Sequence, residues 1–351
     1  MPNPTIGDVH ILAALTDISV AYSQGRDVFI AGKAIPTIPT VKQADKYFIF
    51  SRADWFRSDA QVRAPGTESA GGGYRVSNDV YYCQRQAIHM DVSDPERANA
   101  DPAIDLDVDA TEYVTEQILL AQEIDFVNNV FSTGPAWTGC SATSGYLIGS
   151  STNPTSSSGG YVRVWSDVAS TPIEDIRGEM QSVASKTGRL PNTLFLGPKV
   201  WTALADHPDL IDRIKYTEKG LVTTDLIASL LSLENVYVCW AVQDSGLEMG
   251  SSYASGQTGS TAGMDPVTPG FIAGKNALLC YLEPAPGLRK PSAAYKFVWT
   301  LPTGAPAPRE GARIKRFRME WRESDRIEGE AWWVFKIIAT DLGVFFKSIV
   351  P

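Results

Sequence analysis

Residues 109–131, DATEYVTEQILLAQEIDFVNNVF, carry the strongest helix signal in the chain. Asp109 can accept hydrogen bonds from the first free N–H groups, and Glu112, three residues later, completes a capping box. Apolar side chains recur at helical spacing and form one stripe, made of Val114, Ile118, Ala121, Ile124, Val127 and Phe131. At about 1.5 Å per residue, this helix reaches roughly 30 Å, which is long for a helix within one domain.

A long β-hairpin is expected before this helix. Tyr47–Phe50 is aromatic and β-branched, and the chain then reaches APGTESAGGG at residues 64–73, a loop signal of proline, glycine and small residues. The return strand, 74–92, would span about 60 Å if fully extended, which is wider than a small domain. Either this strand breaks near Ser77-Asn78-Asp79, or the hairpin projects from the body and leaves its edges unpaired.

Charge is distributed unevenly between the hairpin and the segment that follows it. The charges of the hairpin are mainly arginines, namely Arg52, Arg57, Arg63, Arg75 and Arg85. The next segment holds seven carboxylates against one Arg97: Asp91, Asp94, Glu96, Asp101, Asp105, Asp107 and Asp109. A planar guanidinium meets a carboxylate with two hydrogen bonds, so arginines of this kind suit ion pairs at interfaces.

The first 46 residues have the character of an arm. Residues 7–21 could hold one short helix, and Pro36 and Pro39 then flank Ile38. Proline fixes φ and biases the residue before it toward extended geometry, so we expect this piece to run over a surface. An arm with exposed apolar residues needs a partner surface.

The rest of the chain divides into an α/β middle and a β-rich end. Residues 166–300 alternate helical patterns with short apolar strands such as Val236–Val242. In the last segment, 301–351, Phe317, Met319 and Trp321 alternate with charged residues, and Ala331–Ala339 suits a buried strand. The sequence therefore predicts an α+β fold.

Composition excludes several classes of protein. The chain has 351 residues, 44% hydrophobic and 20% charged, which suits about two globular domains or one domain with large projections. A net charge of −9 disfavours a protein whose main task is to grip phosphate backbones. No apolar run approaches the roughly 18–20 residues that span a bilayer. The four cysteines, Cys83, Cys140, Cys239 and Cys280, are far apart and are expected to be reduced thiols.

Two acidic patterns could indicate chemistry. Asp105, Asp107 and Asp109, with Glu116 at the twelfth place, have the spacing of a calcium loop, but the sixth place is Ala110 where such a loop needs glycine. We therefore expect no calcium site and no other metal or cofactor.

Paired carboxylates, Glu328 with Glu330 or Glu320 with Glu323, could serve a glycoside hydrolase. Glu328 and Glu330 are expected at a turn, where such charges are simply solvated. No nucleophile motif accompanies the 3 histidines, so we expect no enzyme.

The order of these pieces resembles the major capsid proteins of tailed bacteriophages, which have the Hong Kong ninety-seven-like fold shared with encapsulin shells. The resemblance covers essentially the whole chain. Four segments are similar to family sequence: Ala53-Asp54-Trp55-Phe56-Arg57, Val127-Asn128-Asn129-Val130-Phe131, Gly197-Pro198-Lys199-Val200-Trp201 and Ile338-Ala339-Thr340-Asp341-Leu342-Gly343.

The resemblance implies a role for each segment. Residues 1–46 would be the N-terminal arm, 47–90 the extended loop that lies across a neighbouring subunit, and 91–165 the first part of the peripheral domain. Residues 166–300 would be the axial domain, and 301–351 the return of the peripheral domain. The spine helix, 109–131, would use Val114, Ile118, Ile124 and Phe131. The loop would form the assembly interface through Arg52, Trp55, Arg57, Arg63, Glu68 and Arg75.

The implied function is a shell of pentamers and hexamers around double-stranded DNA, in the virion and assembled in the host cytoplasm. Implied partners are other copies of the chain, a separate scaffolding protein and a portal, with DNA enclosed without sequence-specific binding and no membrane. An encapsulin-like compartment is the alternative. Some members crosslink through a lysine of the extended loop, but no lysine lies between Lys46 and Lys186, so we expect noncovalent contacts. Arg57 and Arg63 are expected to pair with carboxylates of a neighbour, within residues 91–109.

Overall fold

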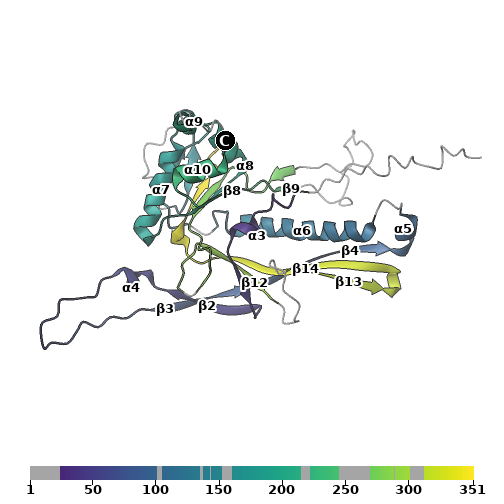
Figure 1. The fold of residues 1–351 in the computed structure, drawn as a ribbon, viewed down its shortest axis with the longest axis horizontal. Helices are drawn as coiled ribbons and strands as arrows, with labels where there is room; N and C mark the ends of the chain where they lie inside the picture. The colour runs from purple at the N-terminus through teal and green to yellow at the C-terminus, as the bar shows by residue number, and fades with distance from the viewer. Residues whose placement is uncertain are drawn as a thin grey trace, which may run out of the picture.

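Two β-sheets and one long helix make up the body of the computed structural model (Figure 1). The structure describes residues 24–100, 105–134, 137–142, 144–151, 160–214, 222–244, 269–287, 289–300 and 312–351. The first half of the expected arm, 1–23, including the helix at 7–21, and the proline-rich connector at 302–308 lie outside the described residues.

The first sheet has five strands and is built around β14, the longest strand among the described residues. Its order is β1-β12-β14-β13, and β4 pairs with β14 as well. The strands are β1 (Thr37–Thr40), β4 (Gln84–Ser93), β12 (Ala294–Trp299), β13 (Ala312–Met319) and β14 (Ser324–Ile337). The helix α6 (Leu106–Asn129) covers one face, so close that a Cβ on Gly329 of β14 would lie 2.3 Å from Val114 Cγ1.

The second sheet has six strands in the order β6-β5-β15-β11-β7-β8. Its strands are β5 (Leu147–Ser150), β6 (Tyr161–Arg163), β7 (Thr193–Leu196), β8 (Asn235–Val238), β11 (Ala277–Cys280) and β15 (Gly343–Lys347). Four helices accompany it: α7 (Pro172–Thr187), α8 (Pro198–Ala205), α9 (Pro208–Ile214) and α10 (Thr224–Leu231). Its inner strands β7 and β11 are buried at every position, which is the pattern of a sheet packed on both faces.

Short elements complete the fold. Two hairpins stand apart from the sheets: β2 (Ala44–Phe50) with β3 (Val76–Tyr82), and β9 (Val242–Asp244) with β10 (Pro269–Phe271). The short helices are α3 (Ala31–Ala34), α4 (Arg52–Phe56), α5 (Asp94–Asn99), η1 (Glu320–Arg322) and η2 (Thr340–Leu342).

Phe126 of α6 joins the two sheets. Its ring centroid lies 5.3 Å from that of Phe195 in the six-stranded sheet and 5.9 Å from that of Phe335 in the five-stranded sheet. Phe131, just beyond the helix, continues this contact by meeting Phe345 edge-on at 5.6 Å. One hydrophobic core therefore runs between the sheets through the C-terminal end of α6.

The helix differs from the sequence expectation at its start and on its buried face. It begins at Leu106, because the Asp105 side chain accepts hydrogen bonds from Asp107 N at 3.1 Å and Val108 N at 3.3 Å. The expected cap at Asp109 is wrong. Val114, Ile118 and Phe131 are buried as expected, but Ile124 is only half-buried. The buried stripe instead includes two polar residues, Gln122 and Glu123.

The long return strand breaks, although not where the sequence suggested. It stays extended through Ser77-Asn78-Asp79 and divides at Cys83 into β3 and β4. Only β3 pairs with β2, whereas β4 pairs with β14, so residues 84–90 of the expected hairpin lie in the five-stranded sheet. The hairpin β2–β3 also projects from the body, with α4 at its outer part (Figure 1).

Several other strands lie in a different sheet from their neighbours in sequence. β5 and β6, in the segment 91–165, and β15, in the segment 301–351, all belong to the six-stranded sheet. β12, in the segment 166–300, belongs to the five-stranded sheet. Glu328 and Glu330 are not at a turn but inside β14, whose turn to β13 is at 320–323.

The substitution Phe126→Ala tests the junction between the sheets. We expect a loss of about 3–5 kcal/mol in the free energy of unfolding, because a fully buried ring that contacts both sheets leaves a cavity. Urea denaturation followed by tryptophan fluorescence measures it. The control Val108→Ala, on the exposed side of the same helix, should change stability by about 0.5 kcal/mol or less. Equal effects of the two variants would contradict the role of Phe126.

Candidate assembly interface

The projecting hairpin has two unlike faces. Tyr47 and Tyr81 point toward the body, where the Tyr81 ring stacks on Phe297 with centroids 4.6 Å apart and planes at 2°. Because side chains alternate along a strand, their neighbours point the other way. That outer face is exposed and largely apolar: it carries Phe48, Val76, Val80 and Tyr82, with the polar Lys46 and Asn78 between them. Phe48 alone is 66% exposed, so the single chain leaves a hydrophobic face without a cover.

Polar contacts fix the base of the hairpin to the five-stranded sheet. Tyr47 donates its hydroxyl hydrogen to Asp79 at 2.7 Å, and Lys336 of β14 lies 3.0 Å from the same carboxyl group. The hydrogen bond from Tyr47 is the main reason that the pKa of Asp79 is lowered. Asp79 is therefore ionised at neutral pH and ties the hairpin to the body.

The short helix α4 forms a second attachment further out. Arg52 pairs with Asp341 at η2, where β14 leads into β15. Arg75 of the returning segment holds Asp54 of α4 through two side-chain bonds of 3.0 Å, which lowers the pKa of Asp54 to about 2. Two separate contacts with the body thus set the direction in which the hairpin points.

Of the remaining predicted loop residues, Trp55 lies in α4, and Arg57, Arg63 and Glu68 lie beyond it. Arg57 forms a two-pronged ion pair with Asp59, and Arg63 donates to the Thr67 carbonyl. All six predicted interface residues are exposed in the single chain: Arg52, Trp55, Arg57, Arg63, Glu68 and Arg75. The structure thus places them along one projection rather than in a cleft.

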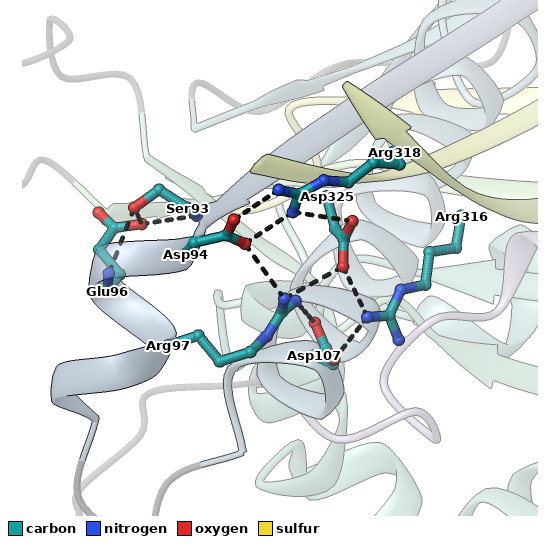
Figure 2. Close-up of polar contacts among 8 residues, drawn as sticks. All are labelled: Ser93, Asp94, Glu96, Arg97, Asp107, Arg316, Arg318 and Asp325. Carbon is teal, nitrogen blue, oxygen red and sulfur yellow. Dashed lines mark hydrogen bonds and ion pairs between the residues drawn. The ribbon is translucent and has the colours of Figure 1, made fainter. Parts of the chain in front are cut away.

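A charge network occupies the opposite end of the molecule, where α5, α6 and the β13–β14 turn meet (Figure 1). Figure 2 shows Asp325 of β14 between three guanidinium groups, those of Arg97, Arg316 and Arg318, at 3.1, 2.8 and 3.5 Å. Asp94 and Asp107 bridge these arginines from the other side. Ser93 and Glu96 form the capping box that starts α5. The network joins segments more than 200 residues apart in sequence.

The arginines lower the carboxyl pKa values in this network. The pKa of Asp94 is lowered chiefly by hydrogen bonds from Arg318, and that of Asp325 by hydrogen bonds from Arg316. Nearby Asp91 is lowered by Arg326 in the same way. Three carboxylates of the acidic segment, those of Asp91, Asp94 and Asp107, are therefore ion-paired within their own chain.

A buried carboxylate, Glu330, lies on the face of β14 away from α6. Its side chain is completely buried and pairs with three cations, those of Arg85, Arg313 and Lys315. Burial by itself raises the pKa of Glu330, but the hydrogen bonds from Lys315 and Arg313 outweigh burial and lower it. A glutamate held by three cations is a poor proton donor, which argues against the glycosidase alternative.

Sequence reasoning missed two functional features of this region. Glu330 was expected at a solvated turn, and its burial among three cations gave no signal, because these cations come from strands β4 and β13 on either side of β14. Glu123 interrupts the helical stripe and is fully buried beside the arm segment 30–31. A charged residue at an expected core position was the available signal for Glu123.

The calcium spacing is explained by the start of the long helix. Asp107, Asp109 and Glu116 lie in α6, and Asp105 caps it, so these carboxylates do not form a loop. Within the described ranges, no group of three or more His, Cys, Asp or Glu side chains is placed to hold a metal ion. Over the same ranges, no helix combines the length and apolar character needed to cross a bilayer. All four cysteines are buried and free.

The substitution Asp325→Ala tests the charge network. We expect a lower melting temperature at about pH 7, because three guanidinium groups lose the carboxylate between them. Lowered pKa values mean that the network stabilises the fold above the ordinary carboxyl range and loses this contribution as pH falls. The difference from the unmodified chain should therefore shrink at about pH 2.

Differential scanning calorimetry at the two pH values measures this effect. Asp59→Ala is the matched control, because it removes an ion pair confined to the projecting loop and should leave the melting temperature nearly unchanged. An Asp325→Ala variant as stable as Asp59→Ala at neutral pH would contradict a stabilising network.

Two curated relatives align with the chain, and each bears the name major capsid protein. That of Burkholderia phage BcepMu is 38% identical over 73 residues, which are 21% of this chain and 24% of the relative. That of Pseudomonas phage JBD67 is 26% identical over 232 residues, which are 64% of this chain and 66% of the relative. The aligned part thus spans less than two thirds of either relative. No protein-family model matches the chain.

Solved structures with the same fold cover nearly the whole chain. A phage-related protein from Bordetella bronchiseptica RB50 aligns with a TM-score of 0.62 at 19% identity, over 93% of this chain and 95% of that one. The capsid protein of cyanophage P-SCSP1u gives 0.55 at 9% identity, over 99% and 95%. An encapsulin from Synechococcus elongatus gives 0.52 at 9% identity, over 97% of each. The mixed α/β arrangement of the two sheets and α6 is therefore that of the Hong Kong ninety-seven-like fold.

Proposed function

We propose that this chain, which is related to the major capsid proteins of tailed phages and has their fold, assembles with copies of itself into an icosahedral shell around double-stranded DNA. Its role is structural and not enzymatic, and its place is the virion capsid. Pentamers and hexamers would be the building units, with assembly in the host cytoplasm.

The exposed apolar face of the β2–β3 hairpin carries this proposal. A soluble monomer would cover or blunt such a face, because it invites nonspecific association. Here the face stands on a projection that two contacts, at Phe297 and at Asp341, hold away from the body. A rigid projection with an uncovered apolar face fits a surface on another copy of the same chain.

The division of the chain into capsid domains is part of the proposal. Residues 1–46 would be the arm, 47–90 the extended loop, 91–165 and 301–351 the peripheral domain, and 166–300 the axial domain. The strand pairing supports moving five strands between these domains. β4 and β12 would join the peripheral domain, and β5, β6 and β15 the axial domain. The spine helix would be α6, which uses Val114, Ile118 and Phe126 for its buried face.

The loop residues would contact a neighbouring subunit in two ways. Trp55 and the apolar hairpin face would supply buried area, while Arg57, Arg63 and Glu68 would form exchangeable ion pairs at the rim. The carboxylates of Asp91, Asp94 and Asp107 are poor partners for these arginines, since they are paired within their own chain. We therefore favour other carboxylates of the neighbour. A scaffolding protein and a portal would be further partners.

An encapsulin-like compartment is the second candidate, because encapsulins share the fold. The sequence relatives favour the phage capsid, since both are phage proteins. The two candidates differ in cargo, which is DNA in one and protein in the other.

Electron microscopy of the expressed full-length chain tests the proposed function. We expect capsomers or closed shells, and a compact monomer would contradict the proposal. Denaturing gels of the particles should show one band near 38 kDa, because residues 47–90 contain no lysine for a crosslink. A ladder of higher bands would contradict noncovalent assembly.

The substitution Phe48→Asp tests the apolar hairpin face. We expect loss of shells, because a carboxylate cannot be buried unpaired against a neighbour. The unassembled chain should keep its melting temperature, since Phe48 is exposed there. The control Phe48→Leu keeps the face apolar and should still assemble. Normal assembly of Phe48→Asp, measured by size-exclusion chromatography and microscopy, would contradict the role of this face.

A further inference from the structure

The described part of the arm lies along α6 and is held by two glutamates of that helix. Gln24 N donates to Glu116 Oε1 at 2.7 Å, and the N–H groups of Ile30 and Ala31 donate to Glu123 Oε2 at 3.0 and 2.9 Å. The two glutamates are seven residues apart, so they lie on one side of the helix about 10 Å from each other. The arm therefore has an outer and an inner attachment.

The two attachments differ in their exposure to water. Glu116 is half-buried near the surface, whereas the Glu123 side chain is fully buried. The Oε1 atom of Glu123 is also buried and has no hydrogen-bond partner among the described residues. An ionised carboxylate in this position would bury one unpaired anionic oxygen, which is costly.

A protonated Glu123 fits the same place better. Its carbonyl oxygen can still accept from both arm N–H groups, and the second oxygen then carries no charge. If the arm detaches, water reaches the carboxyl group and the ionised form becomes favourable. Burial accordingly raises the pKa of Glu123 to about 7 in the docked state, although the two N–H groups oppose this shift.

We propose that Glu123 is the inner latch of the arm and that gain or loss of one proton at this carboxyl group tightens or loosens the latch. The latch lies within one chain, so it can operate before any shell forms. The proposed latch can therefore be tested separately from the proposed assembly.

Other titratable groups lie on the arm, on α6 and on the neighbouring strands. From the segment after β8, the buried Cys239 thiol faces it, and burial raises the pKa of that thiol so far that it stays neutral. On the arm, Lys33 pairs with Asp27 at 3.1 Å in an exposed position. On α6 itself, Asp125 accepts from Trp333 Nε1 at 2.8 Å, and burial raises the pKa of Asp125 as well. On the five-stranded sheet, the buried Lys296 lies over the Phe335 ring at 5.9 Å.

The sign of the pH effect follows from the raised pKa. Protonated Glu123 stabilises the docked arm. This stabilisation is fully present below the ordinary pKa range of a carboxyl group and is lost as pH rises through about 7. Between about pH 6 and about pH 8, the equilibrium constant for docking should fall about tenfold.

Hydrogen exchange of the full-length chain measures the docking equilibrium. The probes are the amide protons of Ile30 and Ala31, with rates corrected for the intrinsic effect of pH. We expect their protection factors to fall about tenfold from pH 6 to pH 8, and in Glu123→Gln to stay high and independent of pH. A flat profile in the unmodified chain, or the same slope in Glu123→Gln, would overturn the proposal.

Two variants serve as controls. Glu116→Gln changes the outer attachment on the same helix and should keep the pH dependence. Cys239→Ala should also keep the pH dependence. If this variant lost the pH dependence, the titrating proton would belong to the thiol, and the proposal would be overturned. If Glu123→Gln does not fold, the unmodified chain alone still tests the proposal, because protection factors that do not change with pH would exclude a titrating latch.

Discussion

The packing of α6 between two sheets is the interaction on which the rest of the structure depends. The five-stranded sheet buries one apolar face under the helix. The end of the helix also meets the six-stranded sheet, because Phe126 contacts both Phe195 and Phe335. A ring of this size in a closely packed interior leaves little freedom to the elements around it. The positions of the arm, the hairpin and the distal charge network all follow from this junction, because each is attached to α6 or to the sheet that it covers.

Charge in this protein is organised locally and not by the net value of −9. Three of the seven carboxylates of the acidic segment, those of Asp91, Asp94 and Asp107, are paired with arginines from β13 and β14. Those pairs are partly exposed, so each contributes little, but together they fasten the far end of the helix to the sheet. Pairing within the chain also explains why Glu330 can be buried, because three cations surround its carboxylate.

The β2–β3 hairpin and the arm both extend the surface of the chain, and both are held in place by contacts with the body. The hairpin is held at Phe297 and Asp341, and its apolar side chains face outward. The arm is held at Glu116 and Glu123 and adds β1 to the edge of the five-stranded sheet. Both extensions therefore keep a defined direction, which lowers the entropic cost of meeting a partner.

The sequence by itself determined the local elements of this protein. The stripe at Val114 and Ile118, the glycine-rich tip at 64–73 and the apolar run of β14 are each read from neighbouring residues, and their number and order resemble the capsid family. Only the tertiary structure decided the helix cap at Asp105, the division of the long strand at Cys83 and the sheet to which β12 and β15 belong. It alone also decided which carboxylates are free to meet a partner. These features depend on contacts between residues far apart in sequence, and local pattern carries no information about such contacts.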